Sequence, residues 1–206
     1  MPRLKAPDQQ DVQHRIRAEA IQLFCAKGYV ATSVNDIVRA AGVTKPVLYY
    51  YFGSKAGLFD ALLGDAFLSL QRLTQEAAEH PGGLRARLLD LVERNFAFCN
   101  QHPEQLRFIL YALFAPEQGI PEVRFPEFHR FNAGIFVRIL DEAHAQGELG
   151  PASPEEAGLH FIGAMHMMLV KRLREPDYTL DRAAAERLVD RYIQGVGIKA
   201  GEETSR

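Results

Sequence analysis

The sequence predicts an all-α protein with about nine helices. Apolar residues recur at three- and four-residue spacing along most of the chain, which is the period of an amphipathic helix. Glycine and proline clusters separate these stretches, and no run of residues has the strict alternation of a β-strand. With 206 residues, of which 47% are hydrophobic, the chain is long enough to bury a core in one or two domains.

The residues between Ser33 and Gly42 predict a short helix with a signal at each end. Ser33 is a common N-cap residue, and Asp36 stands three positions later, where a capping-box acid reaches back to the backbone N–H of the cap. Gly42 ends the helix, because glycine adopts the left-handed conformation without a Cβ clash. The apolar residues of this segment share one stripe at helical spacing: Val34, Ile37, Val38 and Ala41.

A second short helix is predicted from residue 45 to residue 52. Thr44 stands at its N-cap and Pro46 in its first turn, where the fixed φ of proline helps and its missing N–H costs little. Leu48 and Phe52 are four residues apart and share the face that packs on the core. Two capped helices around one glycine turn make a helix-turn-helix, which places one helix in the major groove of DNA.

A third helix is predicted to begin after Gly53. Ser54 is its expected cap, so Lys55 lies at a helix N-terminus, where backbone N–H groups already favour a phosphate oxygen. Hydroxyl groups, ammonium groups and helix N-termini are the usual phosphate donors in protein–DNA complexes. This end of the motif is therefore expected to hold the DNA backbone.

The same stretch resembles the DNA-binding signature of TetR-family transcriptional regulators. The resemblance rests on Ile37-Val38-x-Ala40-Ala41-Gly42-Val43-Thr44-Lys45 followed by Leu48-Tyr49-x-Tyr51-Phe52-x-Ser54-Lys55, and upstream on Ile16, Ala20, Leu23, Phe24 and Gly28, which fit the first helix of the family. Two positions depart from the commonest pattern: Tyr51 stands where a histidine is frequent, and Ala56-Gly57 where an acidic residue often sits. We expect Gly57 to weaken the first turn of its helix by up to about 1 kcal/mol relative to alanine.

The residues of the motif are expected to divide into two groups of DNA contacts. Base-edge contacts are expected from Lys45, Pro46, Val47 and Tyr49, and backbone contacts from Thr32, Ser33, Thr44, Tyr51 and Lys55. The resemblance implies a transcriptional regulator, most commonly a repressor, that leaves a palindromic double-stranded operator when a small molecule binds its C-terminal domain.

Charge is distributed unevenly, although the net charge is only −2. Residues 1 to 59 carry eight Lys and Arg against four Asp and Glu, whereas the remainder carries 16 against 22. A basic end on an acidic body confines the field that attracts phosphate to one part of the chain.

The sequence predicts two domains. Residues 1–56 are expected to form the helix-turn-helix domain with a flexible N-terminal arm, and residues 57–206 a helical domain for ligand binding and dimerisation. Later helices are expected at residues 54–79, 83–101, 103–115, 123–146, 154–174 and 180–198, with an irregular loop at 116–126 that contains three prolines and a glycine. The ends, 1–10 and 200–206, are expected to be disordered.

The last two predicted helices carry broad apolar stripes that suit either ordinary core packing or assembly. The resemblance implies the second, because TetR-like proteins form homodimers by pairing their last two long helices into a four-helix bundle. The residues expected at that interface are Leu159, Gly163, Met167, Val170, Leu188, Tyr192 and Val196.

The middle of the chain is rich in Phe and Met. Most of these side chains are expected in the core, but so many of them around a proline-broken loop also suit a cavity for an apolar or aromatic molecule. The resemblance implies that this domain binds a small-molecule effector. The residues expected to line the site are Phe96, Tyr111, Phe114, Phe128, Phe131, Met165 and His166.

Composition disfavours export, membrane insertion and metal chemistry. The N-terminus lacks the apolar core of a secretory signal, and the longest nearly apolar run, residues 159 to 170, contains two histidines, so a cytoplasmic protein without a membrane span is expected. Cys25 and Cys99 fit no metal or redox spacing and are expected to be reduced, buried thiols. No metal or cofactor is predicted.

Two other function classes stay open from the sequence. One is an α-helical enzyme or lipid-handling protein that uses the aromatic cavity for a substrate, although the chain has no glycine-rich phosphate loop and no His pair at helical metal-ligand spacing. The other is a protein-interaction module with a vestigial helix-turn-helix. The presence of Tyr49, Tyr51 and Lys55 argues against the second alternative.

Overall fold

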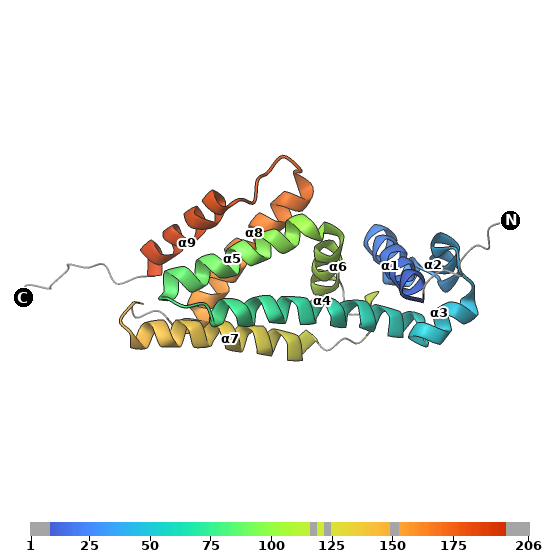
Figure 1. Cartoon of the computed structure of the whole chain (residues 1–206), viewed down its shortest axis with the longest axis horizontal. Coiled ribbons are helices and arrows are strands. Elements are labelled where there is room, and N and C mark those ends of the chain that lie inside the picture. The colour runs from blue at the N-terminus through green and yellow to red at the C-terminus, as the bar shows by residue number, and fades with distance from the viewer. Residues whose placement is uncertain (1–8, 116–118, 122–124, 149–152, 197–206) are drawn as a thin grey trace, which may run out of the picture. The chain divides into compact units, whose positions relative to one another are not determined.

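The computed structural model describes residues 9–115, 119–121, 125–148 and 153–196. Within these ranges the secondary structure is helical, without a strand, as predicted (Figure 1). The helices are α1 (Gln9–Ala31), α2 (Val34–Ala41), α3 (Lys45–Phe52), α4 (Lys55–Ala78), α5 (Leu84–Gln101), α6 (Pro103–Phe114), α7 (Phe125–Ala145), α8 (Pro154–Arg174) and α9 (Arg182–Val196).

From α2 onward, the bounds of the helices lie within about two residues of the predicted ones, which is the usual uncertainty of helix ends. Most of the predicted loop at 116–126 and nearly all of both predicted disordered ends fall outside the described residues.

The chain divides into two compact units. The first contains residues 1–68 and 104–124, and the second contains residues 69–103 and 125–206. This division differs from the expected boundary after residue 56, because the first part of α4 and all of α6 but its first residue group with the helix-turn-helix.

The core of the first unit is aromatic. Phe24 of α1, Phe59 of α4 and Phe108 of α6 are buried. The ring centroid of Phe59 lies 5.4 Å from that of Phe24 and 5.0 Å from that of Phe108. Leu48 of α3 and Ile37 of α2 bury their side chains in the same unit. Helix α6 is thus part of the core that supports the motif, although it follows the motif by about fifty residues in sequence.

The second unit packs α5 against α9 and α7 against α8. Phe136 of α7 stacks on Phe161 of α8 with ring centroids 5.5 Å apart, and a Cβ at Gly158 would lie only 2.9 Å from the Phe136 ring. Glycine therefore permits the close approach of α7 and α8. Ion pairs link neighbouring helices at the surface of the unit: Arg85 with Asp190, Arg87 with Glu142 and Arg94 with Glu76.

Candidate nucleic-acid interface

The predicted cap of α2 is confirmed. The Ser33 hydroxyl accepts from the Asp36 amide at 3.1 Å, and the Asp36 carboxylate accepts from the Ser33 amide at 2.9 Å, which is a complete capping box. Gly42 ends the helix in the left-handed conformation with φ 64°. The backbone N–H of Ser33, its hydroxyl and the Lys27 ammonium hold the pKa of the Asp36 carboxyl well below its usual range.

Helix α3 exposes one face. Lys45, Pro46, Tyr49 and Tyr50 are exposed, with Tyr49 at 45% and Tyr50 at 78% of full accessibility, whereas Leu48 is completely buried. These four positions are related by i, i+1, i+4 and i+5 spacing and therefore lie side by side on a helix. We call them the reading face.

The reading face differs from the predicted set of base contacts at two positions: it lacks one predicted residue and contains one that was not predicted. Val47 is half-buried and lies outside the face, whereas Tyr50 was not predicted and is its most exposed member. The signal for Tyr50 was present in the sequence, because it stands four residues after Pro46.

Thr44 has the backbone conformation of an N-cap residue, but its hydroxyl does not cap α3. Its φ and ψ of −100° and 158° are extended, as an N-cap requires, yet its side chain makes no cap hydrogen bond to α3. The predicted capping contact through the hydroxyl is therefore absent, and the residue is exposed to solvent. This arrangement suits a phosphate contact.

Thr32 does not fit its predicted role as a backbone contact. Its side chain is completely buried, and its hydroxyl donates to the carbonyl oxygen of Gly28 at 2.7 Å and also reaches that of Leu23 at 3.3 Å. The hydroxyl thus supplies a hydrogen bond to backbone carbonyl groups near the end of α1, where the helical hydrogen bonds stop. The expectation that this side chain reaches a phosphate is therefore wrong for the described conformation.

The Lys55 ammonium forms most of its hydrogen bonds within the protein. Its ammonium donates to the carbonyl oxygens of Tyr29 at 2.8 Å and Thr32 at 2.9 Å, and lies 4.0 Å from the centroid of the Tyr29 ring. Partial burial lowers the pKa of this ammonium. Two of its three protons are thus used within the unit, which corrects the expectation of a mainly DNA-directed lysine and leaves one proton for a phosphate.

Gly57 lies against the backbone of the turn between α3 and α4, in a place without room for a side chain, which was not predicted from the sequence. A Cβ at this position would lie 2.1 Å from the carbonyl oxygen of Phe52. The Gly57 amide lies in the first turn of α4 and donates to the Ser54 hydroxyl at 2.9 Å. The expected benefit of alanine at this position is therefore reversed by a steric clash.

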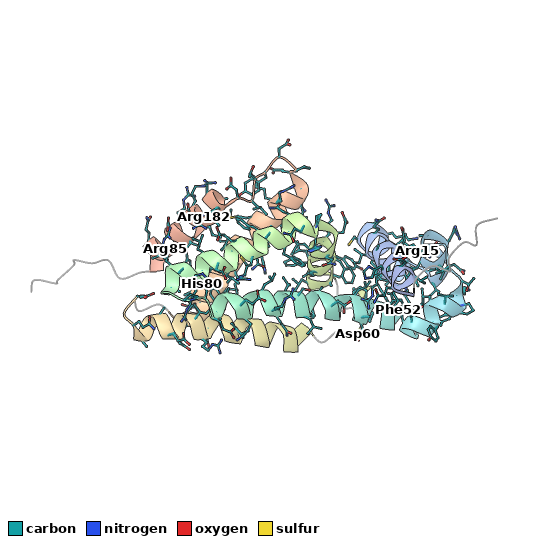
Figure 2. All side chains as sticks on the ribbon, in the orientation of Figure 1. Arg15, Phe52, Asp60, His80, Arg85 and Arg182 are labelled. Carbon is teal, nitrogen blue, oxygen red and sulfur yellow. The ribbon has the colours of Figure 1, made fainter. Side chains whose placement is uncertain are left out.

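Arg17 anchors the far end of α3. Its guanidinium lies 5.3 Å from the centroid of the Phe52 ring and forms an ion pair with Asp65 of α4. Phe52 is half-buried, and it is labelled in Figure 2. This contact of Arg17 was not predicted, because it joins residues far apart in the chain.

The residues predicted to bind a ligand are divided between the two units. Tyr111 and Phe114 belong to α6 in the first unit, where the Tyr111 hydroxyl accepts from a backbone amide and Phe114 is 77% exposed. Phe96 and Met165 are buried core residues of the second unit, and His166 is half-buried there. The side chains of Phe128 and Phe131 lie outside the described residues.

A cavity of about 560 Å³ in the second unit has a different chemistry from the predicted apolar site. Figure 2 labels three of its residues, and its lining is charged and polar to a large extent: His80, Gly83, Leu84, Arg85, Ala86, Leu89, Asp90, Glu93, Glu148 and Arg182. None of the seven predicted ligand-binding residues belongs to this lining.

The residues predicted at a dimer interface separate into exposed and internal groups. Leu159 and Met167 of α8 are 72% and 65% exposed, and a Cβ at the exposed Gly163 between them would meet no atom within 4 Å. Val170 and Leu188 are half-buried, and the side chain of Val196 is not described. We call Leu159, Gly163 and Met167 the α8 stripe.

Tyr192 packs inside its own chain. Its hydroxyl donates to the carbonyl oxygen of Ala157 at 2.7 Å, and its ring meets Phe161 edge-on at 4.8 Å. Burial raises the pKa of Tyr192 to about 12. Its main contacts therefore join α9 to α8 within the chain.

The described residues contain no helix long and apolar enough to cross a membrane. Cys99 is buried and Cys25 half-buried, and both are free thiols. Burial raises the pKa of the Cys25 thiol to about 11.

A capped helix-turn-helix with an exposed reading face, in an otherwise helical chain, defines a DNA-binding transcriptional regulator. Residues 16–62 match the family described as bacterial regulatory proteins, tetR family. The helix-turn-helix part of the chain is thus similar to that of TetR-family regulators.

Comparison with known proteins extends this similarity along most of the chain. A probable HTH-type transcriptional regulator, YttP of Bacillus subtilis, is 26% identical over 167 residues, which cover 80% of this chain and 78% of that protein. The HTH-type transcriptional repressor BepR of Brucella suis is 24% identical over 80% of this chain and 81% of its own length. The crystal structure of NalD, the secondary repressor of the MexAB-OprM multidrug efflux pump in Pseudomonas aeruginosa, superposes with a TM-score of 0.70 at 24% identity, covering 93% of this chain and 100% of that one.

Proposed function

We propose that the protein is a homodimeric cytoplasmic repressor that binds an inverted-repeat operator and leaves it when a small apolar or aromatic molecule binds the helical C-terminal part. The observation that carries the DNA-binding half of this proposal is the reading face of α3. BepR and NalD are both named as repressors, which supports repression over activation. YttP and BepR are both named as transcriptional regulators or repressors, which supports a non-enzymatic role.

The side chains of the reading face suit the edges of bases. The Lys45 ammonium donates to guanine O6 and N7, and Pro46 offers an apolar contact for a thymine methyl group. Tyr49 and Tyr50 add large apolar surface and a hydroxyl each, and both rings are exposed before DNA is bound. We therefore place Tyr50 in the set of base contacts and Val47 at its border.

The backbone contacts are expected beside this face. Thr44 offers an exposed hydroxyl, Tyr51 a phenol and Lys55 its remaining proton. Ser33 is exposed at the N-terminus of α2, where free backbone N–H groups attract a phosphate, although its hydroxyl is occupied by Asp36. Thr32 is left out of this proposal.

A second copy of the chain is the proposed partner of the α8 stripe. Large apolar side chains that are two-thirds exposed on one helix face mark an interaction surface. Dimerisation also supplies a second recognition helix, and two half-sites together give an affinity that one short helix does not reach.

The effector is proposed to bind in the second unit, among its aromatic helices. Phe96, Phe161 and Met165 are buried and His166 is half-buried in this unit, and Phe and Met side chains suit an apolar or aromatic molecule. An effector releases DNA only if it binds the DNA-incompetent arrangement more tightly, and typical couplings of about 1–3 kcal/mol change the DNA affinity roughly 5- to 150-fold.

The DNA-binding proposal is tested by selecting duplexes from a randomised pool with the purified protein. The expected product is an inverted repeat, bound with an affinity whose log–log dependence on salt has a slope of several units. Selection of no common sequence, with equal binding to all duplexes at every salt concentration, would contradict a specific regulator.

The division of contacts predicts different outcomes for two substitutions. Lys45→Ala is expected to lose discrimination at one base pair of each half-site, by about 1–3 kcal/mol, because its donors read one base edge. Thr44→Val is expected to weaken all duplexes about equally and to leave the base preference unchanged. Affinities of both variants for single-base variants of the selected duplex, measured by fluorescence anisotropy, check this prediction. A uniform loss with Lys45→Ala would make Lys45 a phosphate contact instead.

A further inference from the structure

Helix α1 is interrupted at Gly28. The residue has φ 83° and ψ 161° inside the bounds of the helix, a conformation that L side chains rarely adopt. The regular hydrogen bonding of the helix stops there, so the backbone groups of residues 28 to 32 need other partners.

Three side chains from different parts of the first unit supply these partners. The Tyr111 hydroxyl of α6 accepts from the Tyr29 amide at 2.7 Å, and the Thr32 hydroxyl donates to the Gly28 carbonyl oxygen. The Lys55 ammonium at the start of α4 donates to the carbonyl oxygens of Tyr29 and Thr32. The backbone of the interrupted segment is thus hydrogen-bonded to side chains of α6, of α4 and of the segment itself.

The interrupted segment contacts both ends of the helix-turn-helix. At the entry, Thr32 directly precedes Ser33, the N-cap of α2. At the exit, Lys55 follows the end of α3 by three residues and is bonded to the same segment. A shift of residues 28–32 therefore moves the entry and the exit of the motif together.

Helix α6 is fixed against this segment by its own core contacts. Phe108, one helical turn before Tyr111, is buried with its ring centroid 6.2 Å from that of Phe24 and 5.0 Å from that of Phe59. A Cβ at Gly28 would lie at ordinary contact distance, 3.6 Å, from the Tyr111 hydroxyl oxygen, so the φ of 83°, and not a lack of space, favours glycine here.

We propose that Tyr111 is a positioning residue for DNA binding, and that α6 acts as a further helix of the DNA-binding unit. Its hydroxyl holds the Tyr29 amide and so fixes the segment from which α2 starts and to which Lys55 is bonded. This assignment replaces the predicted role of Tyr111 in ligand binding. It rests on the proposed function, because it concerns binding to a specific duplex.

The test is Tyr111→Phe, which removes the hydroxyl and keeps the ring. The probe is the duplex that the wild-type protein selects from a randomised pool, and binding is measured well below the unfolding midpoints. The variant is expected to bind roughly three- to tenfold more weakly, which corresponds to the net contribution of one neutral hydrogen bond. Its salt slope is expected to match that of the wild type, because no phosphate contact is lost. The control, Tyr178→Phe, removes a hydroxyl from the second unit and is expected to bind as the wild type does.

The outcomes separate the two proposals. Failure of the wild-type protein to select any duplex contradicts the proposed function. Normal selection with an unchanged dissociation constant for Tyr111→Phe overturns the positioning role, even if the melting temperature falls, and a salt slope reduced by about one unit would make Tyr111 a phosphate contact. If Tyr111→Phe does not fold, Thr32→Val tests the same segment, and its normal affinity would equally overturn the proposal.

Discussion

Replacing Gly57 by alanine is expected to destabilise the first unit and to weaken DNA binding. A Cβ at this position would lie 2.1 Å from the carbonyl oxygen of Phe52, far inside van der Waals contact. That oxygen also accepts from the Ser54 amide at 2.7 Å, so it does not move away without loss of the turn between α3 and α4. The substitution therefore displaces the end of the recognition helix.

Two opposing effects decide the magnitude. Alanine is favoured over glycine in a helix by up to about 1 kcal/mol, whereas forcing an extra methyl into a packed site costs about 1–3 kcal/mol. The steric term is the larger here, because the neighbour is backbone rather than a flexible side chain. We expect a net loss of about 1–2 kcal/mol, seen in thermal unfolding as a melting temperature lower by roughly 2–8 °C.

A matched substitution on the same helix is expected to have the opposite sign. Gly64 of α4 is exposed, and a Cβ there would meet no atom within 4 Å. Gly64→Ala is therefore expected to stabilise the protein by up to about 1 kcal/mol and to leave the affinity for DNA unchanged. A rise in melting temperature for both variants would show that the turn tolerates a side chain at Gly57.

The parts of the motif that depend on neighbouring residues were predictable from the sequence. The capping box of Ser33 and Asp36 and the left-handed Gly42 follow from spacings of a few residues, and both are present. The burial of Leu48 follows in the same way from helical spacing. Local chemistry alone fixes these features, so one sequence is enough to find them.

The parts that depend on long-range contacts were not predictable. Thr32 and Lys55 are the residue types that bind phosphates, yet the interruption at Gly28 uses the hydroxyl of one and most of the ammonium of the other. Nothing near Tyr111 in the sequence indicates that its partner is the amide of Tyr29, 82 residues away. The same limit applies to Gly57, because only the folded turn brings the Phe52 carbonyl to its Cβ position.

The second unit shows a different limit of sequence reasoning. Phe and Met have the same spacing and composition whether they fill a core or line a cavity, so the pattern does not separate Phe96, a buried residue, from a ligand contact. The polar cavity beside Arg85 was not predicted, because its lining comes from α5, α9 and the segments after α4 and α7. Charged residues at such separations have no joint signal in the sequence.

The largest effect on assembly is expected from Gly163→Glu. The position is exposed in the α8 stripe, and its Cβ direction is free of neighbours within 4 Å, so the substitution is compatible with the fold of one protomer. At an interface between two copies, the same carboxylate would be buried against Leu159 or Met167 of the opposing helix without a cationic partner, which is costly.

We therefore expect light scattering to give a mass near 23.1 kDa for Gly163→Glu and twice that value for the wild-type protein. The variant should also lose affinity for the inverted repeat by about 10²- to 10⁴-fold while it still binds a single half-site weakly, because only the linkage between two recognition helices is lost. Gly64→Glu introduces the same charge at an exposed glycine of α4 and should leave both mass and affinity unchanged. A dimeric mass for Gly163→Glu would place the interface away from the α8 stripe, whereas a monomeric mass with unchanged operator affinity would show that specific binding needs one recognition helix only.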